Sequence, residues 1–247
     1  MTITDQEFVD LPTSRGPMRC AIVRPVGDKK YPGIILFSEI FQITAPIRRT
    51  AAQIAGQGYL VIIPEVYHEF LPLGTVLSYD QAGADQGNEL KISKELSSYD
   101  EDSKVCIDYL RKHPQCTGKI GSMGMCLGGH LSFRCAMNPE ILAAVCFYAT
   151  DIHKRTLGKG MNDNSLDRIP HISGELLMIW GRQDPHIPQE GRQIIHQALL
   201  DAQSNFQWLE FNGAHAFIRD EGPRYNPALA GLCYQHVFEL FKRQLSH

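Results

Sequence analysis

Short apolar runs alternate with longer amphipathic stretches along most of the chain. The runs Gly-Ile-Ile-Leu-Phe at 33–37 and Leu-Val-Ile-Ile at 60–63 carry no polar side chain, as expected for strands buried on both faces of a parallel sheet. The pattern predicts strands at 18–24, 33–38, 60–64, 120–124, 143–149, 176–180 and 206–211. It predicts helices at 46–56, 99–112, 127–137, 189–202 and 227–245. This order favours an α/β fold with a doubly wound, mostly parallel sheet and helices on both faces.

Two long stretches, 68–97 and 150–174, interrupt this alternation with isolated apolar residues among polar residues and glycines. Long connections inside a compact domain are usually functional. Both stretches follow predicted strands, and ligands of doubly wound sheets bind beyond the carboxyl ends of the strands. We therefore expect a single domain over residues 1–247, with 68–97 and 150–174 as loops that form the walls of a substrate pocket.

The composition excludes several classes of function. Hydrophobic residues make up 43% of the chain and charged residues 21%, as in ordinary soluble globular proteins. A net charge of −3 and the lack of a basic stripe argue against nucleic acid as a partner. The amino terminus lacks a secretory signal, and no apolar run is long enough to span a bilayer. We therefore expect a cytoplasmic protein that has no membrane partner.

The seven cysteines are scattered, which is not the spacing of a disulfide framework or of a zinc site. Buried free thiols account for most of them, because unpaired cysteine is among the most buried residue types. Cys126 differs because it lies in Gly124-Met-Cys-Leu-Gly-Gly, between a predicted strand and a predicted helix. This segment matches the nucleophile elbow G-x-S-x-G of the α/β-hydrolase fold, with cysteine in place of serine.

The elbow sequence gives Cys126 the role of nucleophile. Side chains at 124 or 128 would collide with neighbouring backbone in so tight a turn, which accounts for the glycines. The helix dipole favours a thiolate at Cys126, and the backbone N–H of Leu127 is the expected oxyanion donor. Glycine-rich turns between a strand and a helix also cradle phosphates, but a G-x-G-x-x-G pattern and a P-loop lysine are absent here.

An elbow requires an acid and then a histidine later in the chain. Asp184 comes shortly after the predicted strand 176–180, and His215 comes shortly after the predicted strand 206–211. Both therefore lie at the sheet edge where the elbow opens, so that His215 can activate Cys126 while Asp184 fixes the imidazole. His186 is a competitor for the role of base, although it precedes the last strand. The remaining histidines have no metal-ligand spacing, and no metal or cofactor is expected.

Glu39 ends the apolar run 33–38 and is followed by Ile40. A carboxylate at this position lies at the mouth of a central strand, where the fold places its second oxyanion loop. The N–H of Ile40 is therefore the expected second oxyanion donor. The alternative for Glu39 is a solvated carboxylate at a strand end, because charged groups usually stay exposed.

Five segments together resemble the dienelactone hydrolase family, from about Gly33 to the carboxyl terminus. They are Glu39-Ile-Phe, Pro64-Glu-Val-Tyr, Gly124-Met-Cys-Leu-Gly-Gly, Gly181-Arg-Gln-Asp-Pro-His-Ile-Pro and Gly213-Ala-His-Ala-Phe-Ile-Arg. The resemblance implies an α/β-hydrolase that opens the lactone ring of dienelactone to give maleylacetate, without a cofactor. The elbow that contains cysteine and the Glu-Ile-Phe segment make the resemblance specific.

The resemblance also implies roles for single residues. Cys126 corresponds to the nucleophile, and Asp184 and His215 correspond to the rest of the triad. Glu39 resembles the carboxylate that receives the thiol proton when substrate arrives. Arg219 resembles an arginine that binds the substrate carboxylate and draws the glutamate away from the sulfur.

Tyr67 matches a tyrosine of the family and is expected to bind substrate, but the chain departs from the family two residues later. The best-known members have an arginine where this chain has Glu69. A carboxylate there would repel an anionic lactone unless it points away or pairs with a base. Arg48, Arg49 and Arg155 are candidates for a replacement charge.

These observations predict a carboxylic ester hydrolase that opens a lactone or cleaves a small ester with a Cys-His-Asp triad. Its partner is a small-molecule substrate, which can be anionic. A thioesterase or acyl transferase that uses the same triad is one alternative. A non-catalytic ligand-binding protein with a reactive thiol at Cys126 is another, although such a protein needs no Asp–His relay.

Overall fold

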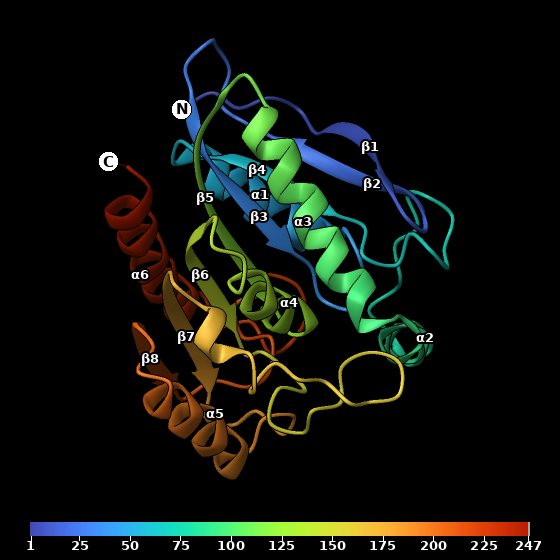
Figure 1. Ribbon diagram of the computed structural model, residues 1–247, viewed down its shortest axis with the longest axis vertical. Coiled ribbons are helices and arrows are strands. Elements are labelled where there is room, and N and C mark those ends of the chain that lie inside the picture. The colour runs from blue at the N-terminus through green and yellow to red at the C-terminus, as the bar shows by residue number, and fades with distance from the viewer. Residues whose placement is uncertain (247) are drawn as a thin grey trace.

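One mixed sheet runs through the centre of the computed structural model, which describes residues 1–246 (Figure 1). Within these residues it has eight strands in the order β1-β2-β4-β3-β5-β6-β7-β8. Strand β2 pairs antiparallel with β1 and β4, and all other neighbours are parallel. The strands are β1 (Glu7–Thr13), β2 (Gly16–Val23), β3 (Tyr31–Phe37), β4 (Leu60–Pro64), β5 (Cys116–Met125), β6 (Ile141–Phe147), β7 (Glu175–Gly181) and β8 (Phe206–Phe211). The predicted fold class, an α/β fold with a mostly parallel sheet, is confirmed.

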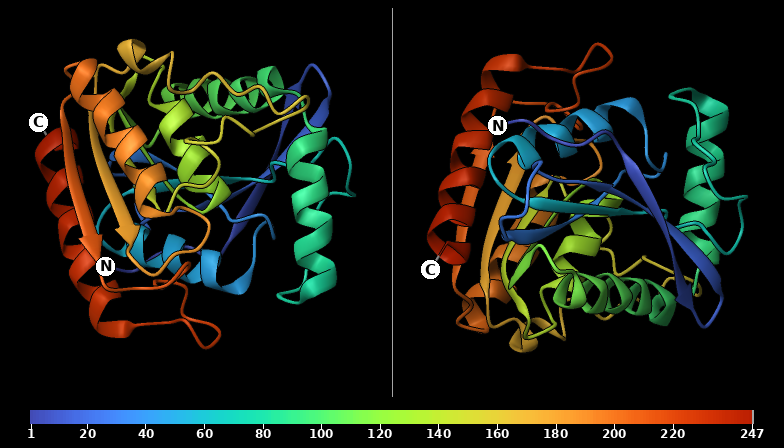
Figure 2. Two further views of the ribbon diagram at one scale, coloured as in Figure 1. Left: turned by 90° about the horizontal axis from the view of Figure 1, so that it is seen from below. Right: turned by 90° about the horizontal axis from the view of Figure 1, so that it is seen from above.

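Helices cover both faces of this sheet. In Figure 1, α3 and α4 lie in front of the central strands, whereas α1 and α6 lie behind them. Helix α2 stands beside these layers rather than on them, as both views in Figure 2 show. The helices are α1 (Ala45–Gly56), α2 (Gln81–Ser93), α3 (Leu96–Lys112), α4 (Leu127–Cys135), α5 (Gln189–Asp201) and α6 (Pro227–Leu245). Among residues 1–246, no helix has both the length and the apolar character that a membrane crossing requires.

The core explains why the central strands were predictable from sequence. Strand β4 is buried at each of its five positions, and β3 is buried from Gly33 to Phe37. Residues buried on both sides of a sheet have to be apolar, so these strands appear in the sequence as continuous hydrophobic runs. Strand β1 lies at the edge of the sheet, and Leu11 is its one buried residue. It therefore lacks such a run and was not predicted.

Helix α2 corrects the prediction that residues 68–97 form a loop. The carboxylate of Asp80 accepts a hydrogen bond of 2.8 Å from the N–H of Gly83 and so caps the helix. The buried residues of α2 are Gly83 and Gly87, so the helix has no apolar stripe that the sequence could reveal. Gly87 packs directly against the backbone of Ile40, where a Cβ would come within 2.7 Å of the carbonyl oxygen. Residues 150–174 remain a loop, apart from a short 3-10 turn at Ile169–His171.

Candidate active site

The turn that carries Cys126 connects β5 directly to α4. Cys126 adopts φ 59° and ψ −119°, a left-handed conformation that is strained for a residue with a side chain. Its N–H donates to the carbonyl oxygen of Phe147 on the neighbouring strand, at 3.1 Å. The strained turn is thus held between β5 and β6, and it presents the sulfur at the carboxyl edge of the sheet.

Two glycines make this turn possible. A Cβ at Gly124 would meet the carbonyl oxygen of Gly128, and a Cβ at Gly128 would meet the carbonyl oxygens of Phe37 and Ser38. These atoms are backbone and cannot move aside without displacing a strand. The close contact between the start of α4 and the end of β3 therefore requires glycine at 124 and 128, as the sequence indicated.

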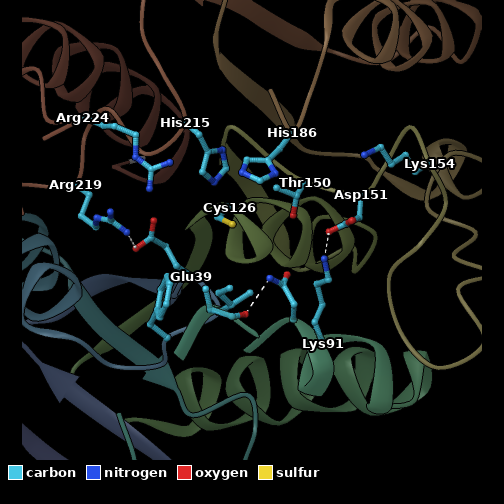
Figure 3. A pocket seen from close by; sticks show the side chains of 14 residues that line it. Glu39, Lys91, Cys126, Thr150, Asp151, Lys154, His186, His215, Arg219 and Arg224 are labelled. Atoms are coloured by element: carbon cyan, nitrogen blue, oxygen red, sulfur yellow. Dashed lines mark hydrogen bonds and ion pairs between the residues drawn. The ribbon is translucent and has the colours of Figure 1, made fainter. Parts of the chain in front are cut away.

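Cys126 is half-buried, whereas the other six cysteines are buried. It lies on the wall of a cavity of about 180 Å³ at the carboxyl ends of the parallel strands (Figure 3). The cavity is smaller than the roughly 300–1,000 Å³ of typical drug-sized ligand sites, so it suits a small molecule. Its lining is Glu39, Ile40, Phe41, Ala84, Asn88, Lys91, Cys126, Thr150, Asp151, Lys154, His186, His215, Arg219 and Arg224.

His215 and Asp184 meet behind this cavity. The Nδ1–H of His215 donates to Oδ2 of Asp184 at 2.6 Å, and both side chains are almost fully buried. The other carboxylate oxygen of Asp184 accepts the backbone N–H of His186 at 2.8 Å. Asp184 is thereby fixed from two sides, and it orients the ring of His215 as the acid of a triad would.

The imidazole of His215 is also confined by aromatic contacts. The rings of Tyr148 and His186 each pack edge-on against it, with centroid distances of 5.0 and 4.6 Å. Burial lowers the pKa of His215, but the sulfur of Cys126 and the carboxylate of Asp184 outweigh this effect and raise the pKa to about 10. The imidazolium form that this pKa favours is the charged partner that a thiolate at Cys126 requires.

Glu39 is buried at the end of β3 and belongs to a second charged group of the cavity. Oε2 of Glu39 lies 3.4 Å from Nη1 of Arg219 and accepts the hydroxyl of Tyr79 at 3.2 Å. The guanidinium of Arg219 stacks over the ring of Tyr79, 4.2 Å from its centroid. Tyr79 therefore contacts both members of the ion pair and holds them together. Its hydroxyl also bonds Thr44 at 2.7 Å.

Neither the backbone N–H of Ile40 nor that of Leu127 has a hydrogen-bond acceptor among residues 1–246. Ile40 follows Glu39 on the cavity wall, and Leu127 is the first residue of α4, directly after Cys126. Helix amino termini and loops of this kind stabilise developing negative charge. The assignment of these two N–H groups as oxyanion donors stays a prediction.

Tyr67 lies elsewhere than expected. It is fully buried, does not line the cavity and donates its hydroxyl to the carbonyl oxygen of Gly87, at 2.9 Å. Contact of Tyr67 with substrate stays a prediction. Its hydrogen bond attaches α2 to the segment that follows β4, so Tyr67 supports the cavity wall from behind.

Glu69 points away from the cavity and pairs with a base. Its carboxylate contacts Nζ of the fully buried Lys94 at 2.5 Å and accepts the hydroxyl of Ser98. Lys94 also lies 3.0 Å from Asp102. Burial raises the pKa of Glu69, but the hydrogen bonds from Lys94 and Ser98 outweigh it and lower the pKa. Glu69 thus stays charged within this ion network and does not repel an anion bound in the cavity.

None of the three arginines considered as replacements lines the cavity. Arg49 pairs with Asp220, and Arg155 pairs with Asp167. The cations at the cavity are instead Lys91, Lys154 and Arg224, together with Arg219. Sequence reasoning missed the first three because nothing in a surface lysine or arginine shows the direction in which it points. Lys91 in addition lies on α2, which was not predicted.

Ligand atoms of Asp184, His186 and His215 all lie within 4.8 Å of one another, a spacing that could hold a metal ion. Nδ1 of His215 and Oδ2 of Asp184 are already joined by the 2.6 Å hydrogen bond, which makes these two residues a histidine–carboxylate relay. The edge-on His186 ring is the one member that is not engaged in the relay.

This fold is that of an α/β-hydrolase, and comparison with known proteins defines the family. The model of the dienelactone hydrolase family matches residues 18–245. The chain belongs to the dienelactone hydrolase family and is a hydrolase of that kind.

Two sequence relatives and one solved structure illustrate the similarity. A Saccharomyces cerevisiae protein provisionally named carboxymethylenebutenolidase is 46% identical, covering 99% of this chain and 93% of the relative. The carboxymethylenebutenolidase of Pseudomonas putida is 29% identical, covering 81% of each chain. The structure of a dienelactone hydrolase-like promiscuous phosphotriesterase from metagenomic libraries shares the fold, with a TM-score of 0.79, 16% identity and 98% of both chains covered.

Proposed function

We propose that the chain is a carboxylic ester hydrolase that opens a lactone or cleaves a small ester, with Cys126 as nucleophile. One observation carries this proposal. Cys126, in its strained elbow turn, lines the same cavity as His215, and Nδ1 of His215 is hydrogen-bonded to the buried carboxylate of Asp184. The same three residue types in this chain order form the triads of the fold. A ligand-binding protein would have no use for the Asp184–His215 pair.

The reaction follows from these positions. The Cys126 thiolate attacks the ester carbonyl, and the N–H groups of Ile40 and Leu127 stabilise the negative oxygen that forms. Collapse of this intermediate releases the alkoxide, which takes a proton from the His215 imidazolium and leaves as an alcohol. In a lactone the alcohol stays attached to the acyl group. His215 then removes a proton from water, which attacks the thioester, and the acid departs while Cys126 is regenerated.

Glu39 and Arg219 supply a substrate-dependent switch in this proposal. Arg219 and Tyr79 both contact the same carboxylate oxygen of Glu39, Oε2. A carboxylate on the substrate competes for Arg219 and releases Glu39. The freed carboxylate can then accept the thiol proton, so that the nucleophile ionises when the substrate is bound.

A turnover screen tests the proposed function. Dienelactone, simple lactones, aryl esters and acyl thioesters are each incubated with wild-type protein and with Cys126→Ala. We expect hydrolysis of a lactone or an oxygen ester that depends on Cys126. Turnover of thioesters alone would favour a thioesterase, and turnover that persists in Cys126→Ala would refute the nucleophile.

Replacing Arg219 by alanine should lower kcat/KM about ten- to a hundredfold for a lactone that bears a carboxylate. The reason is the loss of a charge-assisted contact, which contributes about 1.5–3 kcal/mol. A neutral aryl ester should be almost unaffected. Steady-state kinetics with both substrates provide the measurement.

Glu39→Gln is the matched variant, because it keeps the size and a hydrogen bond but cannot accept a proton. It should slow acyl-enzyme formation more than it weakens binding, as single-turnover kinetics would show.

Equal losses for charged and neutral substrates in Arg219→Ala would mean that the arginine is structural. The anionic-substrate switch would then be wrong.

A further inference from the structure

The charges around the cavity are distributed on two sides of the nucleophile. Figure 3 shows Arg219 and Arg224 on one side of Cys126, with Lys91 and Lys154 on the other. The two arginines follow β8, whereas Lys91 lies on α2 and Lys154 on the loop after β6. Three separate segments therefore bring positive charge to one small cavity.

Two of these four cations are already neutralised. Arg219 pairs with Glu39. Nζ of Lys91 lies 2.9 Å from Oδ2 of Asp151, and the side chains of Lys91 and Asp151 are mostly buried. Burial raises the pKa of Asp151, but Lys91 outweighs this effect and lowers the pKa, so the second pair is ionised.

Lys154 and Arg224 are the cations left over. Among residues 1–246 neither forms an ion pair or a side-chain hydrogen bond, and both line the cavity. The cavity lining thus carries an excess of two positive charges, one on each side of the sulfur, although the whole chain has a net charge of −3. Concentrated charge of one sign in a cleft attracts ligands of the opposite sign.

We propose that the substrate is a small ester or lactone with an anionic group on each side of its reacting carbonyl. Arg224, beside Arg219, binds one group, and Lys154, beside Lys91, binds the other. This inference rests on the proposed function and narrows its substrate to a dianion, such as an ester that joins a dicarboxylic acid to a hydroxy acid. The carbonyl between the two charges is thereby centred over Cys126.

Four esters of matched shape test the proposal: propyl butanoate, monopropyl succinate, carboxymethyl butanoate and carboxymethyl succinate. Each terminal carboxylate replaces a methyl or ethyl end, so the chain length stays similar while the charge changes. We expect each charge to raise kcat/KM about three- to tenfold in the wild type, because exposed side chains provide only part of a charge-assisted contact. Proton release followed in a pH-stat gives the rates.

Two variants then assign the charges to the two sides. Lys154→Met should remove the advantage of one carboxylate, and Arg224→Gln should remove the advantage of the other. Lys159→Met serves as the control, since Lys159 is on the same loop as Lys154, pairs with Glu95 and does not line the cavity. Its preference for the dianion should equal that of the wild type. A wild type that hydrolyses propyl butanoate as fast as carboxymethyl succinate would overturn the proposal, as would two variants that affect the same carboxylate.

A binding measurement separates failure of this proposal from failure of the hydrolase function. Isothermal titration calorimetry should show heptanedioate binding with a Kd about three- to tenfold lower than that of heptanoate, and this difference should shrink in Lys154→Met. The measurement requires no turnover. Tighter binding of heptanedioate without any ester hydrolysis would retain the dianion site and refute the hydrolase. Ester hydrolysis with equal affinity for both acids would do the reverse.

Discussion

Cys126→Ala should lower kcat for the hydrolysed ester or lactone by about 10⁴-fold or more, with the fold intact. Loss of the nucleophile leaves only the oxyanion donors and substrate binding to accelerate the reaction. Once Glu39 or a ligand permits ionisation, iodoacetamide near neutral pH should modify Cys126 of the wild type before any other cysteine, because the thiolate and not the thiol attacks. Peptide mapping after labelling identifies the modified residue.

Cys233→Ala is a suitable control for this experiment. Burial raises the pKa of Cys233 to about 12, so its thiol stays protonated and unreactive near neutral pH. The variant should keep both the activity and the labelling of Cys126. Modification of another cysteine to an equal or greater extent, with activity unaffected, would remove Cys126 from its proposed role.

The elbow could be predicted from sequence because its constraint is local. Steric exclusion at Gly124 and Gly128 acts through neighbouring backbone, and the residues that satisfy it are consecutive in the chain. The positions of Asp184 and His215 could be inferred for a related reason. Each follows a hydrophobic strand, and parallel strands bring their carboxyl ends to the same edge.

The rest of the cavity wall depends on interactions that leave no pattern in the sequence. Helix α2 packs through glycines, and its place is fixed by single polar contacts such as Tyr67 with the backbone of Gly87. The direction of the Glu69 side chain could not be predicted from sequence either, because a carboxylate can face a ligand or a buried lysine. Its partner Lys94 is 25 residues away and belongs to no motif. Only the tertiary structure shows that the two meet.

His215→Ala and Asp184→Asn should each lower kcat by about 10³- to 10⁴-fold, and the double variant should be little worse than either single one. The two residues act as one unit through the 2.6 Å hydrogen bond, so their contributions do not add. Steady-state kinetics of the three variants measure this. Near-normal kcat in His215→Ala would require His186 to be the base instead. An Asp184→Asn variant that keeps its activity would mean that the carboxylate merely stabilises the loop.

The pH dependence of His215 supplies an independent test of the same unit. Its pKa of about 10 lies above the roughly 6.5 of an unperturbed histidine. The protonated ring therefore contributes folding free energy that is fully present below about pH 6.5 and is lost as the pH rises through about 10. Asp184→Asn and Cys126→Ala each remove a negative group that raises the pKa of His215. Both variants should therefore lower this pKa and move the loss of folding free energy to a lower pH.

Titration of the His215 ring by NMR follows the shift in pKa. Asp201→Asn is the control, because Asp201 is an exposed carboxylate at the end of α5, and this variant should leave the pKa of His215 unchanged. A pKa that stays near 10 in both variants would show that neither the sulfur nor the carboxylate acts on the imidazole, and the triad would have to be abandoned.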